Sequence, residues 1–298
     1  MIGTNRSYQH AFYFMKLEPI ATDEQSLTAC TELLSAAFPK DNHHKIAYLK
    51  WLYADNPVGS VVGFNAWEND KIVGHYASLP VELYLDGAPA RGLLALHTAM
   101  HPDYRNAGTI YSLAKKTCNI AREQGFACIY AVANAASTPI FTKAMGFQLV
   151  RQLTASMGIA SLRPDWRIAN TGNRFRRRWR SETARWRGNN PINPTQIVPR
   201  NDGCMAFYAP THIPGIHAYG LMQLEDTMPA IGSRDPGLVK LFLGILPEHS
   251  YSHLTYLPIP ERLKPSPLNF IYLPLADSAP QRLAENEVIM GVHDFDPY

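Results

Sequence analysis

An apolar run at residues 92–100 leads into His101-Pro102-Asp103-Tyr104-Arg105-Asn106-Ala107-Gly108-Thr109-Ile110, and a helical pattern begins at about Thr109. A strand, a turn and a helix in this order leave the first backbone N–H groups of the helix unpaired at the turn. The positive end of the helix dipole adds to their field. Such a junction is typical of a pyrophosphate site, and Gly108 lets the backbone approach an anion closely.

A second pattern follows at Asn134-Ala135-Ala136-Ser137-Thr138-Pro139-Ile140-Phe141-Thr142-Lys143-Ala144-Met145-Gly146-Phe147. It predicts a strand end, a helix cap, a short helix that ends at Gly146, and a new strand from Phe147. The predicted helix 109–124 and the predicted strand 127–133 separate the two patterns. The order and the spacing of the two patterns carry more information than either does alone.

Together the two patterns resemble the GNAT superfamily of acyl-CoA N-acyltransferases, over residues 12 to about 158. The family's Arg/Gln-x-x-Gly-x-Gly/Ala loop is matched at Arg105 and Gly108 and departs at Ile110, where the family has Gly or Ala. The resemblance implies acetyl-CoA, or another acyl-CoA, as acyl donor. It also implies a set of donor-binding residues, which are Thr98, Ala99, Met100, Arg105, Asn106, Ala107, Gly108, Thr109, Ile110, Asn134, Ser137 and Phe141.

The resemblance implies a mixed α/β fold with a central, mostly antiparallel twisted sheet that is splayed between two parallel strands and flanked by helices. Periodicity and turn residues predict strands at 12–17, 60–67, 72–80, 92–100 and 127–133, and helices at 22–38, 43–53 and 109–124. The crossover from 92–100 to 127–133 should be right-handed. In the resembled fold these two strands separate, and the pantetheine arm pairs with the main chain of residues 98–100 beside a bulge.

Amide formation requires a neutral amine, so a base that works near neutral pH must take its proton. His97 directly precedes the expected donor-pairing segment and is the leading candidate, because histidine has an ordinary pKa of about 6.5. Glu82 and His75 are the alternatives. A histidine on a strand also fits a structural role as a hydrogen-bonded core residue, so both roles stay open.

The departing thiolate needs a proton donor, and many relatives use a tyrosine on the helix of the second motif. The matching residue here is Phe141, which has no proton to give. Tyr111 and Ser137 are the remaining candidates, unless water fills the role. Asn134 and Ser137 also fit a purely local role as strand end and helix cap.

Nine arginines lie between Arg163 and Arg187, against Asp165 and Glu182, so this segment carries a charge of +7 while the whole chain carries +3. Phe175, Trp179 and Trp186 are spaced as one stripe of a helix. We therefore predict an Arg/Trp-rich basic linker helix within residues 161–199. It would dock its aromatic stripe on the protein, contact an anionic membrane surface or an anionic substrate, or bind nucleic acid, the last being the least favoured.

The predicted organisation is a leader at 1–11, a GNAT domain at 12–160, the basic linker at 161–199 and a degenerate GNAT-like half at 200–298. The last part contains strand-like runs at 218–224, 269–273 and 288–292 and a helical pattern near 236–246. It has no complete Arg/Gln-x-x-Gly-x-Gly/Ala loop, so we expect it to close one side of the acceptor site without binding a donor of its own. Long relatives among polysaccharide-assembly genes share this organisation.

The apolar content of 46% suffices for sizeable cores, and no run approaches the roughly 20 apolar residues that cross a bilayer. The four cysteines lack metal-type spacing, so we expect reduced thiols, no metal site and a cytoplasmic protein, peripheral to the membrane if the basic segment docks there. The preferred acceptor is an amino sugar or nucleotide amino sugar, with Trp51, Tyr53 and Asn56 lining its pocket. The alternatives are a small amine or amino acid acceptor, a non-catalytic CoA-binding protein, or a membrane-docked scaffold.

Overall fold

The computed structural model describes residues 15–39, 44–105, 107–159, 161–232, 239–247, 256–264 and 266–296. A nine-stranded sheet follows the order β1-β2-β3-β4-β5-β14-β6, while β8 pairs with β3 and with β15. Its strands are β1 (Lys16–Pro19), β2 (Val62–Glu68), β3 (Lys71–Leu85), β4 (Ala88–Met100), β5 (Cys128–Ala133), β6 (Gln148–Gln152), β8 (Phe175–Arg177), β14 (Asn269–Pro274) and β15 (Val288–Ile289).

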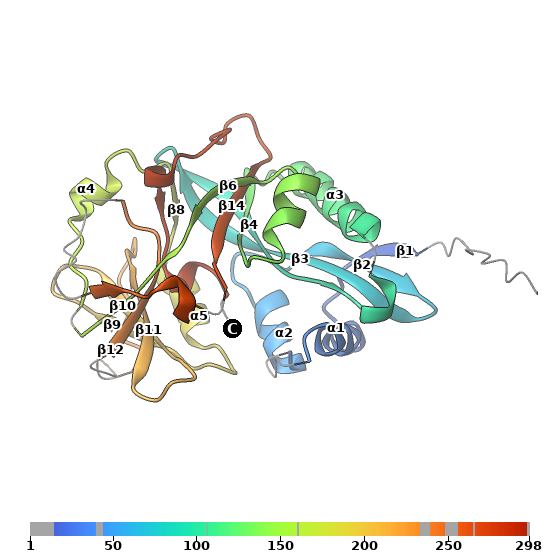
Figure 1. Cartoon of the computed structure of the whole chain (residues 1–298), viewed down its shortest axis with the longest axis horizontal. Coiled ribbons are helices and arrows are strands. Elements are labelled where there is room, and N and C mark those ends of the chain that lie inside the picture. Colours follow the sequence, from blue (N-terminus) through green and yellow to red (C-terminus); the bar gives the residue numbers. More distant parts are fainter. Residues whose placement is uncertain are drawn as a thin grey trace, which may run out of the picture.

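Helices cover both faces of this sheet, α1 (Glu24–Ala37) and α2 (Ile46–Tyr53) on one and α3 (Ala107–Glu123) on the other (Figure 1). Helix α1 begins at Asp23, whose carboxylate accepts the N–H of Ser26 at 3.0 Å. Each helix buries an apolar stripe of period 3.6 against the sheet, as the sequence predicted. The mixed α/β fold class, with its mostly antiparallel sheet flanked by helices, is confirmed.

A second, six-stranded sheet lies beside the first in the order β13-β7-β12-β11-β10-β9 (Figure 1). Its strands are β7 (Thr154–Gly158), β9 (Gln196–Pro199), β10 (Met205–Pro210), β11 (Ile216–Met222), β12 (Val239–Gly244) and β13 (Tyr256–Pro258). The short helices α4 (Trp166–Asn170) and α5 (Ser181–Gly188) connect the two sheets. The C-terminal part therefore has its own sheet.

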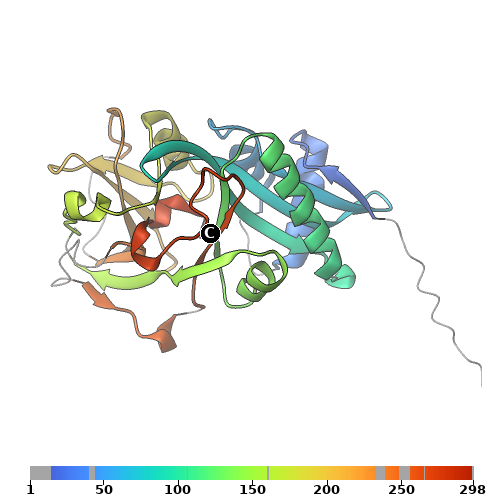
Figure 2. The ribbon, with the colours of Figure 1, turned by 90° about the horizontal axis from the view of Figure 1, so that it is seen from above.

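The two sheets exchange strands. Strand β14 from the C-terminal part lies between β5 and β6, pairing Asn269 with Ala133 on one side and with Gln152 on the other. In the opposite direction, β7 follows directly after β6 of the first sheet but belongs to the second sheet, where it pairs with β12 (Figure 2). The predicted division at residue 160 stays a prediction, and strands cross it both ways.

The predicted basic helix is wrong. Residues 166–170 and 181–188 form two short helices, and between them Phe175–Arg177 forms strand β8 against the end of β3. Within β8 the side chains of Phe175 and Arg177 are buried and that of Arg176 is not, so the local period is 2. Tertiary pairing with β3 thus overrides the helical spacing of the aromatic residues.

Two other sequence predictions change in the structure. The helix expected near 236–246 is strand β12 from Val239, which pairs with β11 on one side and β7 on the other, and 236–238 lie outside the described residues. The first strand that the structure describes runs from Lys16 to Pro19, and residues 12–14 of the predicted strand lie outside the described residues together with the leader at 1–11.

Candidate functional site

The parallel strands β4 and β5 separate partway along their length. Their pairing extends only over Gly92–Cys128, Leu93–Ile129 and Leu94–Tyr130, although β4 continues to Met100 and β5 to Ala133. Strand β5 is paired on its far side with β14, and β4 with β3. Beyond Leu94 the edge of β4 that faces β5 therefore has no strand partner among the described elements.

A β-bulge in β4 coincides with this separation. Ala77 pairs with Leu96 and His75 pairs with Ala99, so two residues of β4, His97 and Thr98, face one residue of β3. His97 has a φ of +47°, in the left-handed region that side chains other than glycine rarely adopt. Such strained positions persist where the surrounding structure holds them, and they concentrate at functional sites.

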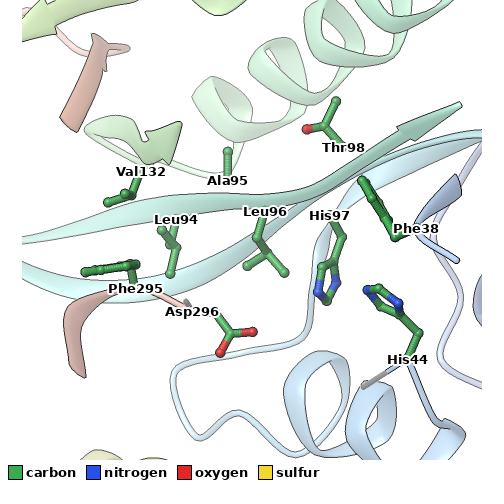
Figure 3. Close-up of a pocket in the computed structure, with 10 residues that line it drawn as sticks. All are labelled: Phe38, His44, Leu94, Ala95, Leu96, His97, Thr98, Val132, Phe295 and Asp296. Carbon is green, nitrogen blue, oxygen red and sulfur yellow. The ribbon is translucent and has the colours of Figure 1, made fainter. Parts of the chain in front are cut away.

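The bulge decides which way His97 points. Along β4 the side chains alternate, with Leu94 toward α1 and α2 and Ala95 toward α3. Strict alternation would aim His97 toward α3, but the inserted residue turns it to the same side as Leu96, while Thr98 points away (Figure 3). His97 thereby faces α2.

His97 lines a cavity of about 210 Å³ at the point where the strands separate. Residues 94–98 of β4 form one wall, and His44, Phe38 and Val132 contribute others. Phe295 and Asp296, from the C-terminal end of the described chain, complete the lining (Figure 3). The cavity thus combines two imidazoles, a carboxylate and apolar walls, as small-molecule sites commonly do.

A buried chain of hydrogen bonds runs from His97 into the protein. The Tyr53 hydroxyl, at the end of α2, lies 2.7 Å from His97 Nδ1 and 2.9 Å from His75 Nε2. His75 Nδ1 lies 2.6 Å from Asn65 Oδ1 on β2. Two of the residues proposed as bases, His97 and His75, are therefore joined through a tyrosine.

Both histidines of this chain are held neutral. Burial, with a smaller contribution from His44, lowers the pKa of His75 to about 3. Burial also lowers the pKa of His97 well below its ordinary value, and His44 and His75 add to the shift. Burial raises the pKa of Tyr53 well above its ordinary value, so the phenol keeps its proton. At neutral pH His97 is therefore a neutral imidazole, in which one ring nitrogen is free to accept a proton.

The depressed pKa values make stability depend on pH. Unfolded histidine titrates near 6.5, whereas His75 binds its proton only near pH 3, so the unfolded state binds more protons between these values. We expect the free energy of unfolding to fall with decreasing pH below about 6.5, by about 1.4 kcal/mol per pH unit for each such histidine. Urea unfolding from about pH 7 to about pH 5 measures the slope. His75→Gln should reduce it, and an equal slope in this variant would contradict the assignment.

Glu82, the third candidate base, is separated from the cavity. It lies on β3 beyond the bulge, where its carboxylate is 3.4 Å from Arg178 and 3.3 Å from Arg180. Glu225 pairs with the same two arginines. The structure therefore places Glu82 in an ion-pair network at the junction with the second sheet.

The expected pyrophosphate loop lies at the start of α3. Arg105 and Gly108 are exposed there, at the N-terminal end of α3, while Asn106 and the Ala107 side chain lie outside the described residues. Thr109 is half-buried and its hydroxyl contacts the Met15 sulfur at 3.6 Å. Ile110, which departs from the family pattern, packs in the core between α3 and the sheet, so its side chain points away from the loop.

The residues of the second motif have local partners. The Asn134 side chain accepts the N–H of Ser137 at 2.9 Å and its hydroxyl at 3.0 Å, which is a helix cap. Phe141, in a π-helical turn (Ile140–Ala144), is buried against Tyr76 and Phe147. These contacts match the structural roles that the sequence left open.

The residues expected beside the donor arm lie on the free part of β4. Ala99 is buried, whereas Thr98 and Met100 are half-buried. The Thr98 hydroxyl is buried without a hydrogen-bond partner in the described part of the chain. A buried orphan hydroxyl beside an unpaired strand edge fits a polar arm that adds hydrogen bonds there, as the pantetheine of an acyl-CoA would.

Sequence reasoning missed His44 and Asp296 altogether, and it gave Tyr53 a different role as a pocket-lining residue. Asp296 is held by the Tyr48 hydroxyl and by Arg187, whose guanidinium lies 3.4 Å away. Both side chains of the ion pair are almost fully buried, at 6% and 3% exposure. The positions of Tyr48 and Tyr53 on a predicted helix do not indicate what their hydroxyl groups contact, because the partners lie on distant strands and near residue 296.

Most arginines of the basic segment interact with other residues of this chain. Its arginines pair with carboxylates or lie over aromatic rings, as seen for Arg174, Arg176, Arg177, Arg178, Arg180 and Arg187. Trp186 stacks on Trp51 with ring centroids 4.8 Å apart, and each indole N–H donates to the other's carbonyl at 3.0 Å. The segment thus joins the second sheet to α2, in keeping with the docked role among those predicted.

The described residues hold neither a group of three or more side chains suited to a metal ion nor a helix with the length and apolar character needed to cross a membrane. The four cysteines are free thiols. In Cys30 and Cys128, burial raises the pKa, to about 12 for Cys30, so neither is a thiolate at neutral pH.

A sheet opened between two parallel strands, with a bulge in the first and a helix N-terminus between them, defines an acyltransferase-type α/β domain. A family model for the acetyltransferase (GNAT) domain matches residues 18–150. Residues 18–150 therefore match the GNAT acetyltransferase domain, and a second sheet follows this part of the chain. The sequence matches none of the curated proteins with which it was compared.

Solved structures share the fold at low sequence identity. A probable N-acyltransferase of unknown function from Enterococcus faecalis is 10% identical at a TM-score of 0.57, covering 87% of this chain and 72% of that chain. A GCN5-related N-acetyltransferase from Anabaena variabilis is 13% identical at 0.55, covering 88% and 73%. Eis1 from Mycobacterium abscessus is 10% identical at 0.50, covering 76% and 65%. The likeness spans both sheets.

Proposed function

We propose that this protein transfers an acetyl or other acyl group from an acyl-CoA to the primary amine of a small acceptor. The observation that carries the proposal is the position of His97. It is a neutral imidazole turned by a strained bulge into a cavity at the point where β4 and β5 separate. A GNAT domain supplies the donor site, because domains of this family generally bind acetyl-CoA.

The residues divide the chemistry between them. His97 takes the proton from the acceptor amine as the nitrogen attacks the thioester carbon, and a tetrahedral intermediate forms. The free edge of β4 beyond Leu94 offers main-chain N–H groups to the oxygen that gains charge. Collapse of the intermediate breaks the carbon–sulfur bond, and the thiolate needs a proton. Tyr111, which is exposed on α3, is our candidate for this donor.

The cavity is lined by polar groups as well as apolar ones. Asp296 and His44 line the same space as His97 (Figure 3), and the charge of Asp296 is balanced there by Arg187. We propose an amino sugar or nucleotide amino sugar as the acceptor to test first, with a small amine or an amino acid as runner-up.

Two residues that we expected in the acceptor pocket have other partners. Trp51 is buried in its stack on Trp186, and the amide of Asn56 donates to the carbonyl of Pro80 at 2.9 Å. Aromatic stacking on a sugar ring therefore has no support from Trp51. Support for the amine class comes instead from the neutral His97 imidazole in the cavity, which can accept the proton that an amine must lose.

Turnover tests the proposal directly. Purified protein is mixed with acetyl-CoA and a panel of amino sugars, nucleotide amino sugars, small amines and amino acids, and released thiol is followed. Acceptor-dependent thiol release would support acyl transfer and name the acceptor. Tight acetyl-CoA binding without turnover on any acceptor would favour the alternative of a non-catalytic CoA-binding protein.

A membrane-docked scaffold is the other alternative, because the segment 163–187 is strongly basic. The ion pairs that these arginines make within the protein argue against the scaffold role, because a guanidinium group that is already paired with a carboxylate attracts an anionic lipid surface less strongly. Binding to anionic vesicles that is lost with salt and lost when exposed arginines such as Arg167 are neutralised would support this role.

We expect Gly108→Glu to abolish the rise in melting temperature that acetyl-CoA produces. A carboxylate at the exposed start of α3 repels pyrophosphate, and we expect affinity to fall at least ~10-fold. The same carboxylate favours the helix dipole, so the melting temperature without donor should not fall for electrostatic reasons. Gly108→Gln has a similar size and no charge, and is the matched control. Equal donor binding by the Glu and Gln variants would place the pyrophosphate elsewhere.

A further inference from the structure

We propose that Tyr53 is a positioning residue, which fixes the His97 ring with its proton on Nδ1 and leaves Nε2 as the basic nitrogen. The inference rests on the proposed function of His97 as the base, and it adds which atom of the ring does the work. It arises from the buried chain Asn65, His75, Tyr53 and His97, whose donors and acceptors can be assigned one after another.

The assignment begins at the far end of the chain. Asn65 Nδ2 donates toward the Cys30 sulfur at 3.7 Å, which turns Asn65 Oδ1 toward His75 Nδ1 at 2.6 Å. An amide oxygen only accepts hydrogen bonds, so His75 Nδ1 must carry a proton. His75 is a buried neutral imidazole, and its Nε2 is therefore an acceptor.

Tyr53 passes this direction on to His97. Its hydroxyl has one proton, which goes to His75 Nε2 at 2.9 Å, because that nitrogen can only accept. The Tyr53 oxygen is then the acceptor for His97 Nδ1 at 2.7 Å, so His97 Nδ1 carries a proton. A neutral His97 with its proton on Nδ1 has its lone pair on Nε2.

The reverse direction conflicts with the orientation of the Asn65 amide, which has Nδ2 toward the Cys30 sulfur and Oδ1 toward His75. If Tyr53 donated to His97, His75 Nε2 would have to donate to Tyr53 and its Nδ1 would become an acceptor. That nitrogen would then face the Asn65 oxygen at 2.6 Å, two acceptors in a buried site. The Asn65 amide on β2 thereby sets the tautomer of His97 on β4. The hydrogen bonds pass through His75 on β3 and Tyr53 on α2.

The tautomer matters because a base accepts its proton on one atom only. Nδ1 is taken by Tyr53, so acyl transfer must use Nε2. Without Tyr53 the ring can exchange its proton between the two nitrogens and can turn away from the cavity. A histidine in the wrong tautomer or orientation loses much of its catalytic effect even when the ring itself is retained.

The direct test is the ¹⁵N spectrum of the histidine side chains in the unmodified protein, with His97 assigned from the signals missing in His97→Gln. We expect a protonated Nδ1 and an unprotonated Nε2 for His97 at neutral pH. Protonation on Nε2 would overturn the inference. This measurement needs no turnover, so it separates the inference from the proposed function.

The second arm is Tyr53→Phe, which keeps the ring and removes the hydroxyl. We expect kcat to fall at least ~10-fold with KM for acetyl-CoA unchanged, and the fixed Nδ1–H signal of His97 to be lost. Tyr219→Phe is the matched control. It removes a buried tyrosine hydroxyl from β11, where Arg200 donates to it at 3.2 Å, away from the cavity. An unchanged kcat together with an unchanged His97 signal in Tyr53→Phe would overturn the inference, whether or not His97→Ala is active.

Discussion

Replacing His97 with alanine is expected to lower kcat by about 10²- to 10⁴-fold, the usual contribution of a positioned general base. The residue is the imidazole that the bulge in β4 turns into the cavity, and burial keeps it neutral at neutral pH, with one ring nitrogen free to accept a proton. Affinity for acetyl-CoA should change little, because we place donor binding on main-chain groups and on the start of α3. Steady-state kinetics with the best acceptor, alongside acetyl-CoA binding, measures both quantities.

His101→Ala is the matched control for this variant. His101 lies just after β4 and caps a short turn, with the N–H of Asp103 directed to its Nδ1 at 3.4 Å. It does not line the cavity, so kcat should stay within about twofold of the unmodified protein. If both variants lost activity equally, or if His97→Ala kept full activity, a different group would have to be the base.

Replacing Asp296 with alanine is expected to lower the free energy of unfolding by about 3–5 kcal/mol, the usual cost of leaving one partner of a buried ion pair without the other. Arg187 would stay buried on α5, where the Phe295 carbonyl at 2.7 Å and the Trp51 ring carry no opposite charge. The Tyr48 hydroxyl on α2 would lose its acceptor as well. Urea unfolding followed by far-UV circular dichroism measures the loss.

Two further variants make this test sharper. Glu18→Ala breaks the exposed pair with Lys16 and should cost less than about 1 kcal/mol. The double variant Arg187→Met, Asp296→Leu removes both buried charges and should be more stable than Asp296→Ala alone. A cost for Asp296→Ala no larger than that of Glu18→Ala would show that the pair does not hold the C-terminal end against α2 and α5.

Local chemistry made the first part of the fold predictable. Asp23 caps α1, and the turn before Gly108 precedes α3, because both boundaries depend on residues a few positions apart. The buried stripe of α3 was also readable from its spacing. Strand β8 was not, since three residues give too short an alternation to compete with the helical spacing of Phe175, Trp179 and Trp186.

The site was predictable only in part. His97 and His75 could be proposed from their chemistry and their place on strands, but Tyr53 looked like a residue of the acceptor pocket. Its role depends on α2 bringing one hydroxyl within hydrogen-bond distance of two strands. Asp296 gave no signal, because its contribution requires the chain end to return to a cavity formed by residues 94–98.

The exchange of strands also constrains how the protein is made. Strand β5 receives its second neighbour only when β14 has been synthesised, and Asn269 must find Ala133 across nearly half of the chain. Until then the edge of β5 stays open on the ribosome, where unpaired strands are prone to wrong pairing. Such a long-range contact slows folding, because the intervening loop must close first. We expect that a truncated N-terminal part would not be a working enzyme but an unfinished sheet.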